Sequence, residues 1–491
     1  MYSELETSQQ PAIELLKSLG YNYLSPEKAV KQRGNLFNVI LKDILKKQLI
    51  KLNSYEYKNE TYKFSDKNIN QAIKDIDEPL TEGLVKTNER IYDLLQLGRS
   101  YQEDLPDSSK RSFDLRYIDW ENIENNVFHV TEEFSVERTS ANHARPDIVL
   151  FVNGIPFVII ECKKAAISVK EGISQSIRNQ GKAWIPHLFK YIQLILSVNK
   201  NDGKYATCGS PEKYWSIWRE EEKDWLEQEL AKLITDREPT YQDRMLISLL
   251  SPSRLMELVQ YYVVFDRDEK KIARYQQYFA VKAILKTIKK SDKEGNRQGG
   301  VIWHTQGSGK SLTMIMLAKC ILADKEILDP KVVVVTDRIN LDKQIRNNFA
   351  HTRMKPVRAR SGNHLIDLIK TGKREIITSL VHKFEIAANK GVKDHSRNIF
   401  VLVDESHRTQ YGELHQKMKL VFPNACYLGF TGTPLMKHEK RNTYVKFGST
   451  KPIHSYPISQ AVEDNAIVPL LYEGKMVDQS VNRKAIDIVL I

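Results

Sequence analysis

Residues 300–322 read GVIWHTQGSGKSLTMIMLAKCIL, and this stretch decides the fold of the second half of the chain. An apolar run at 300–304 is followed by a glycine-rich turn and then by an apolar segment typical of a buried helix. Strand, glycine-rich loop and helix in this order let backbone N–H groups approach phosphate oxygens at a helix N-terminus. The stretch therefore predicts a nucleotide phosphate site at the edge of a parallel sheet.

The loop itself carries the residues that such a site needs. Gly307 and Gly309 leave room for phosphate oxygens, and we expect Lys310 to reach the β- and γ-phosphates. The Ser311 hydroxyl would ligate Mg²⁺. The strict GxxxxGK[ST] pattern is not met, because His304 stands where its first glycine would be. The predicted nucleotide-binding residues of the loop are Thr305, Gly307, Ser308, Gly309, Lys310 and Ser311.

Further apolar strands alternate with helical patterns after residue 272, as in a parallel sheet that is covered on both faces. One strand, IFVLVD, ends in Asp404-Glu405, and a later one, CYLGF, is followed by TGTP at 431–434. We expect Asp404 to hold Mg²⁺ through water and Glu405 to polarise the attacking water. The predicted strands lie at 300–304, 331–336, 375–378, 399–404 and 426–430.

In this order, the glycine-rich loop, DESH at 404–407 and TGTP resemble the first RecA-like domain of superfamily 2 helicases and translocases. Arg274-Tyr275-Gln276-Gln277 resembles the Q motif of that family, which implies that Gln277 recognises adenine. TDRINLDKQ at 336–344 and TSLVHKF at 378–384 resemble motifs Ia and Ib, which contact the DNA backbone in that family. The resemblance implies ATP and Mg²⁺ as ligands.

A second constellation lies in RPDIVLFVNGIPFVIIECKK at 145–164. Two β-branched apolar runs flank Asn153-Gly154, a favoured hairpin turn. The hairpin would place Asp147 within about one residue of Glu161 across the ladder, and Lys163 would share the face of Glu161. The two carboxylates suit Mg²⁺, and Lys163 could orient the attacking water and stabilise developing charge. The grouping therefore predicts phosphodiester hydrolysis.

Pro146-Asp147 followed by Glu161-x-Lys163 is similar to the PD-(D/E)xK pattern of RecB-like nucleases. Asp147, Glu161 and Lys163 are then the catalytic residues, and the two carboxylates are the metal ligands. Gln180 with Trp184 resembles the glutamine–aromatic element of those nucleases, and Gln175 is the alternative. An acidic residue on the first helix often completes such a site, and the candidates here are Glu4, Glu6 and Glu14.

Composition limits the remaining classes of protein. The 491 residues carry a formal net charge of +12, which permits nucleic-acid binding. No apolar run approaches the ~18 residues of a membrane span, and we expect no secretory signal behind MYSELETSQQ. The four cysteines have no CxxC spacing, which excludes a zinc ribbon or a disulfide scaffold and fits a cytoplasmic location.

The sequence therefore predicts an α/β multidomain chain. A PD-(D/E)xK (RecB-like) nuclease domain is expected at 1–210, a helical connector at 211–271, and a first RecA-like domain at 272–465. The start of a second RecA-like domain is expected at 466–491. In the connector, Trp215, Trp218 and Trp225 fall at helical spacing, which we interpret as a packing face rather than a surface that stacks on DNA.

A nuclease followed by such a motor resembles the R subunit of type I restriction–modification enzymes, HsdR, and FHVTEEFSVER at 128–138 also resembles that family. The resemblance implies cleavage of unmodified double-stranded DNA away from the recognition site, driven by ATP-dependent translocation. It implies modification (M) and specificity (S) subunits as partners, with S-adenosylmethionine entering only through them, and no membrane.

Members of that family continue into a second RecA-like domain with arginine fingers, whereas this sequence stops at Ile491. We therefore expect a truncated chain that holds ATP weakly and does not translocate DNA by itself. Two other hypotheses stay open. One is a nuclease–helicase of DNA repair or another defence system without methyltransferase partners, and the other is a non-catalytic fragment that binds DNA or a partner.

Overall fold

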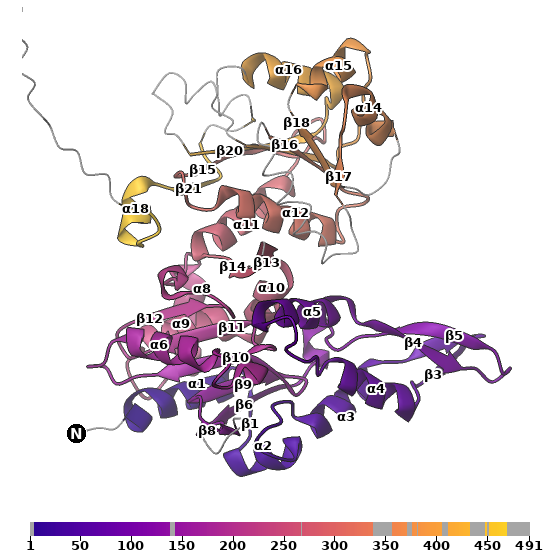
Figure 1. The fold of residues 1–491 in the computed structure, drawn as a ribbon. Helices are drawn as coiled ribbons and strands as arrows, with labels where there is room; N and C mark the ends of the chain where they lie inside the picture. Colours follow the sequence, from indigo (N-terminus) through magenta and orange to yellow (C-terminus); the bar gives the residue numbers. More distant parts are fainter. Residues whose placement is uncertain are drawn as a thin grey trace, which may run out of the picture.

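Two β-sheets, one in each half of the chain, organise the structure, a computed structural model (Figure 1). It describes residues 4–137, 143–266, 268–336, 356–370, 376–380, 382–404, 411–432, 447–448 and 451–468. Within these ranges, no helix is long and apolar enough to cross a membrane.

The N-terminal sheet has six strands of mixed direction. Its centre is the predicted hairpin, in which Ile148 lies opposite Ile160 and the chain turns at Asn153 and Gly154. Both turn residues have positive φ, 53° and 84°, as a tight two-residue hairpin turn requires. In pairing order, the strands are β1 (Asn22–Tyr23), β6 (Phe128–Glu132), β9 (Ile148–Val152), β10 (Ile155–Cys162), β11 (Leu194–Val198) and β12 (Gly203–Ala206).

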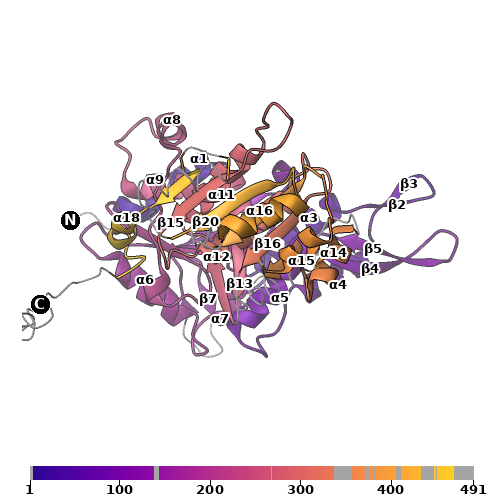
Figure 2. The same cartoon turned by 90° about the horizontal axis from the view of Figure 1, so that it is seen from above.

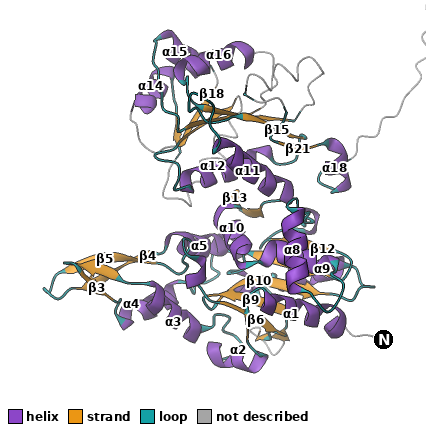
Figure 3. Ribbon diagram, turned by 180° about the vertical axis from the view of Figure 1, so that it is seen from behind, coloured by secondary structure: helices purple, strands orange, loops and turns teal. Residues whose placement is uncertain are grey.

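Helices pack around this sheet, and an arm leaves it. Helix α1 (Gln10–Ser18) follows the π-helical turn η1 (Leu5–Gln9) and contacts β6, whereas α6 (Val169–Asn179) packs on β10 and β11. The hairpins β2–β3 and β4–β5 project to one side of the molecule (Figures 2 and 3). The other elements here are α2 (Pro26–Arg33), α3 (Lys42–Leu52), β2 (Tyr55–Tyr57), β3 (Glu60–Tyr62), α4 (Asp66–Asp75), α5 (Leu84–Leu97), β4 (Arg99–Asp104), β5 (Lys110–Leu115), β7 (Val136–Glu137), β8 (His143–Ala144) and α7 (Pro186–Phe189).

The C-terminal sheet has seven strands, all paired in parallel, which is the RecA-like arrangement expected from the sequence. In pairing order they are β17 (Val357–Arg358), β18 (Ile376–Leu380), β16 (Lys331–Thr336), β19 (Ile399–Asp404), β20 (Cys426–Thr431), β15 (Gly300–His304) and β21 (His454–Tyr456).

Helices cover both faces of this sheet, and alternate residues of β16 face the two covers. Val332 and Val334 belong to the core shared with α11 (Tyr275–Ile288) and α12 (Lys310–Ala323). Val333 and Val335 belong to a separate core. Its helices are α14 (Gly362–Lys370), α15 (Lys383–Asn389) and α16 (Tyr411–Val421), which lie over the sheet in Figure 2. This alternation explains why the strand is continuously apolar.

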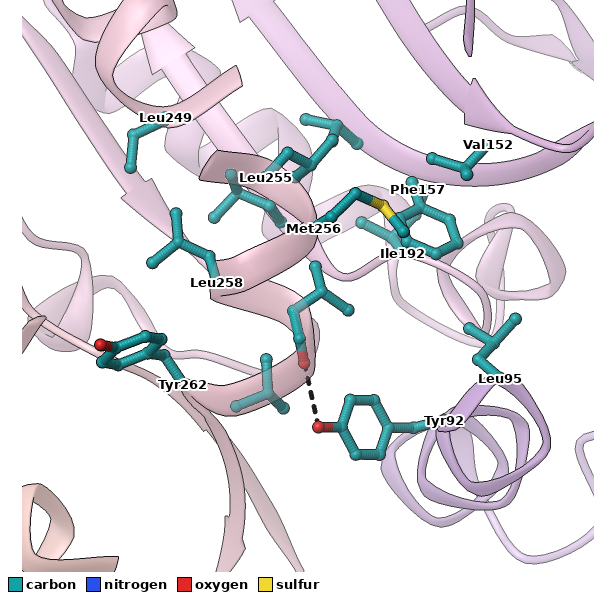
Figure 4. Packing of buried hydrophobic residues seen from close by; sticks show 14 of the residues in the cluster. Tyr92, Leu95, Val152, Phe157, Ile192, Leu249, Leu255, Met256, Leu258 and Tyr262 are labelled. Atoms are coloured by element: carbon teal, nitrogen blue, oxygen red, sulfur yellow. Dashed lines mark hydrogen bonds between the residues drawn. The ribbon is translucent and has the colours of Figure 1, made fainter. Parts of the chain in front are cut away.

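The expected connector contains helices, packs against both the N-terminal unit and α11–α12, and ends in a hairpin. Its elements are α8 (Lys223–Leu233), α9 (Tyr241–Leu250), α10 (Pro252–Tyr261), β13 (Val263–Asp266) and β14 (Glu269–Ile272). Met256 of α10 lies among Phe157, Ile192 and other core residues, and the Tyr92 hydroxyl donates to the Val259 carbonyl at 3.0 Å (Figure 4).

The tryptophan prediction is partly wrong. Only Trp225 lies on a helix, because α8 begins at Lys223 and the chain is not helical at Trp218. Trp215 and Trp218 are nevertheless buried, at 5% and 4% exposure, so the packing interpretation of these two rings is confirmed.

Two buried lysines fasten the β13–β14 hairpin to both halves of the chain. The Lys270 ammonium of β14 donates to the side-chain oxygens of Asn88 and Gln193 in the N-terminal unit, at 2.8 and 2.6 Å. Lys319 of α12 donates to the Val263 carbonyl at 2.8 Å. Burial lowers the pKa of Lys270 to about 7 and that of Lys319 to about 8.

Candidate nuclease and nucleotide sites

The β9–β10 hairpin brings Asp147 and Glu161 together, as the sequence predicts. Asp147 directly precedes β9, and its Oδ2 accepts a hydrogen bond from the Cys162 N–H at 2.7 Å. Glu161 lies in β10 and is completely buried. Burial and the charge of Asp147 raise the pKa of Glu161 well above its usual range. A buried carboxylate beside a half-buried one favours a bound cation.

Lys163 completes the predicted trio. Its ammonium lies 3.4 Å from Asp147 Oδ2 and donates to the Cys162 carbonyl at 2.8 Å. Burial opposes the charge of Lys163, but Asp147, Glu161 and Glu4 outweigh it and raise its pKa. The ammonium therefore stays protonated beside the carboxylates.

The fit of a metal rests on one unsatisfied atom. Gln175 donates to Glu161 Oε2 at 2.7 Å, whereas Glu161 Oε1 is buried and has no hydrogen-bond partner among the described residues. A hard cation would satisfy such an oxygen, since carboxylates are the ligands that Mg²⁺ prefers. In the described part of the chain, no group of three or more His, Cys, Asp or Glu side chains is arranged to hold a metal.

The accessory residues at the carboxylates differ from those that the sequence favoured. Gln175, which the sequence left as the alternative, contacts Glu161, whereas Gln180 accepts from the Gly209 N–H at 2.7 Å. Among the acidic candidates, Glu4 reaches the site and lies 3.7 Å from the Lys163 ammonium. Glu14 pairs with Lys17 on an exposed face instead. Which of the two glutamines faces Glu161 depends on how α6 is turned about its own axis. The spacing of the residues in the sequence does not determine that rotation.

Helix α6 also forms a wall beside the carboxylates. Gly172 lets it approach, because a Cβ there would lie 3.1 Å from Glu161 Cβ and 2.3 Å from Ser197 Oγ. A cavity of about 440 Å³ opens between α6 and Lys163. Lys170 and Arg178, two turns apart on α6, line it. These two basic residues, which line the cavity together with Glu171, were not predicted from the sequence, where their signal is the Lys170-x₃-Ser174-x₃-Arg178 spacing.

In the second half of the chain, the glycine-rich loop joins β15 to α12 as expected. Gly307 and Gly309 have φ of 84° and 89°, which a side chain would disfavour. The Ser308 hydroxyl donates to the Thr305 carbonyl at 2.7 Å and closes the turn. Lys310 begins α12, and its ammonium donates to the His304 carbonyl at 3.4 Å. Ser311 is the next residue of this helix.

The other predicted motifs end at the same edge of the sheet. Asp404 is the last residue of β19 and pairs with Phe430 of β20, and Trp303 of β15 pairs with Thr431. Gly432 lies so close to Lys310 that a Cβ there would be 2.7 Å from its ammonium. The edge thus gathers Asp404, the start of TGTP and the glycine-rich loop. Glu405 and most of the expected motif Ia lie outside the described residues.

Gln277 touches the glycine-rich loop directly. Its Nε2 donates to the Gly309 carbonyl at 3.1 Å, and its Oε1 accepts from the Arg274 N–H at 2.9 Å. Gln277, Gly307, Ser308 and Gly309 line a cavity of about 290 Å³. The structure therefore places Gln277 against the glycine-rich loop.

Comparison with known families assigns the two halves separately. Residues 1–214 match the type I restriction enzyme R protein N terminus, and residues 276–490 match the SWI2/SNF2 ATPase family. The two matches cover separate stretches of the chain, which we call the R-protein region (1–214) and the ATPase region (276–490) after the families that they resemble. The R-protein region contains Asp147, Glu161 and Lys163, and the ATPase region contains the glycine-rich loop and Asp404.

Curated relatives resemble both regions together. A putative type I restriction enzyme endonuclease subunit, MjaIXP, of Methanocaldococcus jannaschii is 31% identical over 98% of this chain and 47% of its own length. The HindI endonuclease subunit of Haemophilus influenzae is 30% identical over 95% of this chain and 45% of its own. The chain thus spans about half the length of these relatives.

Solved structures also resemble part of this chain. One of them is the SWI2/SNF2 ATPase core of Sulfolobus solfataricus in complex with double-stranded DNA. It is 15% identical to this chain, covers 37% of it and 36% of its own chain, and has a TM-score of 0.27.

Proposed function

We propose that the chain is the nuclease and motor part of a type I restriction–modification R subunit. An Mg²⁺-dependent endonuclease would cut unmodified double-stranded DNA away from the recognition site, and an ATP-driven motor would translocate that DNA. The observation that carries the proposal is the convergence of Asp147, Glu161 and Lys163 on one hairpin, 3.4 Å separating the Lys163 ammonium from Asp147. The R-protein and ATPase family matches support it.

The nuclease residues divide the work of hydrolysis. Asp147 and Glu161 would hold Mg²⁺, which when bound polarises the phosphate and activates water. The Cys162 N–H fixes Asp147, and Gln175 fixes Glu161. The Lys163 ammonium, charged beside both carboxylates, would orient the attacking water and stabilise the charge that develops at phosphorus.

The basic face of α6 would seat the DNA strand that is cut. Lys170 and Arg178 are exposed and line the cavity that opens next to Lys163. The Arg178 guanidinium stacks on Trp184, 4.3 Å from the ring centroid, which limits its freedom. Contacts of this kind bind backbone phosphates without reading sequence, so recognition of a site is left to a specificity subunit.

The ATPase residues have matching roles at the sheet edge. Lys310 would bind the β- and γ-phosphates, and the backbone of 305–309 would cradle them. Ser311 and Asp404 would hold the Mg²⁺ of MgATP, Glu405 would polarise the attacking water, and Gln277 would contact adenine. The gathering of Lys310, Asp404 and Gly432 at one edge supports this assignment.

The wider assembly follows from the same proposal. We propose a nuclease domain at 1–210, a connecting segment at 211–271, a first RecA-like domain at 272–465 and the start of a second at 466–491. The chain would act in the cytoplasm with M and S subunits, and S-adenosylmethionine would bind only to those partners.

A plasmid assay tests the proposal. Unmethylated supercoiled plasmid is incubated with the chain, M and S subunits and Mg²⁺, with and without ATP. Cleavage that needs both ATP and the partners and is lost in Asp147→Ala and Lys163→Ala would support the proposal, and it would also show that a second RecA-like domain is less essential than the sequence suggests. Asp104→Asn serves as the matched control, because Asp104 is 80% exposed on the arm, where it pairs with Lys110.

Other outcomes would favour the competing hypotheses. Nicking in Mg²⁺ alone that is lost in Asp147→Ala would identify an autonomous nuclease half that is uncoupled from the motor. Co-purification with M and S subunits would separate the restriction hypothesis from a repair or defence enzyme without methyltransferase partners. Background cleavage that is unchanged in Asp147→Ala would identify a non-catalytic binding fragment.

A further inference from the structure

His304 occupies the position where a strict phosphate loop has its first glycine, and the nucleotide roles proposed above leave it without a task. The side chain is completely buried at the end of β15. Its Nε2 lies 2.8 Å from Nδ1 of His454, in the neighbouring strand β21. A polar ring this deeply buried needs a hydrogen-bond partner, so the contact with His454 helps to fix the residue from which the glycine-rich loop begins.

A carboxylate fixes the direction of this hydrogen-bond chain. Nε2 of His454 lies 3.0 and 3.2 Å from the two carboxylate oxygens of Glu221. An ionised carboxylate only accepts, so His454 Nε2 donates to Glu221. When His454 is neutral, its Nδ1 then accepts from His304 Nε2–H. His304 Nδ1, which has no partner among the described residues, is then a bare acceptor rather than a stranded N–H.

The charges around His304 agree with a neutral ring. Burial, followed by the neighbouring His454 and Lys310, lowers the pKa of His304 well below its usual range. The Lys310 ammonium also donates to the His304 carbonyl. The ring of His304 therefore faces β21, and its carbonyl faces the lysine that is proposed to bind phosphate.

Strand β21 holds the start of the loop in a second way. The Thr305 N–H donates to the Tyr456 carbonyl at 3.0 Å, one residue beyond His304. The segment 219–222, which precedes α8, in turn holds the β21–α18 region, where α18 spans Ile458–Glu463. Arg219 pairs with Glu463 and Asp464, each at 2.9 Å. Glu221 is thus one of two residues in this segment that fix the strand beside the loop.

We propose that Glu221, His454 and His304 form a relay of hydrogen bonds through which segment 219–222 positions the phosphate loop for nucleotide. Glu221 and His454 are positioning residues that act through His304. The inference rests on the proposed nucleotide site, and it adds that the affinity of this site depends on a segment next to the R-protein region.

The relay can be tested without nucleotide by amide hydrogen exchange. In the full chain, Glu221→Ala should speed exchange in peptides covering 300–311 by about 10-fold, because the Thr305 amide loses its fixed partner strand. Glu221→Gln should keep the slow exchange of wild type, since the amide oxygen of the glutamine can still accept a hydrogen bond from His454. Glu222→Ala is the matched control, because Glu222 pairs with Arg254 at 3.3 Å instead. Unchanged exchange in Glu221→Ala would overturn the relay.

Nucleotide affinity supplies the second measurement, with a fluorescent ATP analogue and Mg²⁺ as the probe. Glu221→Ala and His454→Ala should each weaken binding about 10-fold, the equivalent of one charge-assisted hydrogen bond. The double variant should bind the analogue no more weakly than either single variant does, because both changes break the same series of hydrogen bonds. Additive losses would overturn the relay.

The two measurements separate the two proposals. If the wild-type chain failed to bind the analogue while exchange responded to Glu221→Ala, the nucleotide assignment would fall and the hydrogen-bond relay would stand as a structural device only. Normal binding that Glu221→Ala leaves unchanged, together with unchanged exchange, would remove the relay alone.

Discussion

The Gln175 side-chain amide donates a 2.7 Å hydrogen bond to Glu161, the carboxylate whose other oxygen is buried without a partner in the described structure. This bond orients one candidate metal ligand and leaves its second oxygen available.

We therefore expect Gln175→Ala to reduce Mg²⁺-supported cleavage by about 10- to 100-fold, as is typical when a partner that orients a metal ligand is lost. Gln180→Ala should stay within about twofold of wild type, because Gln180 bonds Gly209 and Ser176 and does not contact the carboxylates. Cleavage is measured over a range of Mg²⁺ concentrations. Equal effects of the two changes would contradict the assignment of Gln175.

The α6 face makes a separate prediction about DNA. Replacing Lys170 and Arg178 by alanine should weaken binding of duplexes of different sequence to the same extent and lower the slope of log affinity against log salt by about two. The measurement is a fluorescence-anisotropy titration at several salt concentrations. Lys232→Ala is the control, because Lys232 lies on α8 and is 71% exposed beside Glu229. Sequence-dependent losses would instead indicate base recognition.

Two glycines offer a matched pair for the nucleotide site. Gly309 and Gly391 both have positive φ, 89° and 66°, so alanine strains the backbone at either position by about 1 kcal/mol. A Cβ at Gly309 would lie 2.4 Å from Gln277 Nε2, whereas a Cβ at Gly391 would meet nothing within 4 Å. We expect Gly309→Ala to weaken binding of an ATP analogue, because Gln277 must move away from the loop, and Gly391→Ala to preserve it. Similar affinity in both variants would argue against the placement of Gln277.

Lys270 predicts a pH dependence of stability. Its pKa is about 7 in the folded protein, lowered by burial from an ordinary value of 10.5. Between these values the unfolded chain binds more protons, so this residue makes the free energy of unfolding rise with pH by at most about 1.4 kcal/mol per unit.

Urea unfolding of wild type and Lys270→Met between pH 6.5 and 9.5 measures this contribution. The stability difference in favour of wild type should grow as pH rises through about 7, and the difference cancels the titration of other groups. A constant difference would show that Lys270 keeps its ordinary pKa.

Local patterns predicted a large part of the fold and the site. The Asn153-Gly154 turn set the register that joins Asp147 to Glu161, and the strand–loop–helix pattern located Lys310, because both depend on residues close in sequence. The contacts that were predicted wrongly, or not predicted at all, depend on packing between residues far apart in the sequence. Gln175 was separated from Gln180 only by the way α6 docks, and no local signal brings Glu221 to His454, which is 233 residues away.

The packing of α10 has a consequence for where the chain can be divided. Met256, Val259 and the Lys270 ammonium complete the interior of the R-protein region, although they follow its family match at 1–214 by tens of residues. The stretch that must be synthesised before this core can close therefore extends to about Ile272. A fragment ending at 210 would leave open to solvent the apolar surface that α10 covers, and we expect it to bind more of the dye ANS and to melt less cooperatively than a fragment ending at 272.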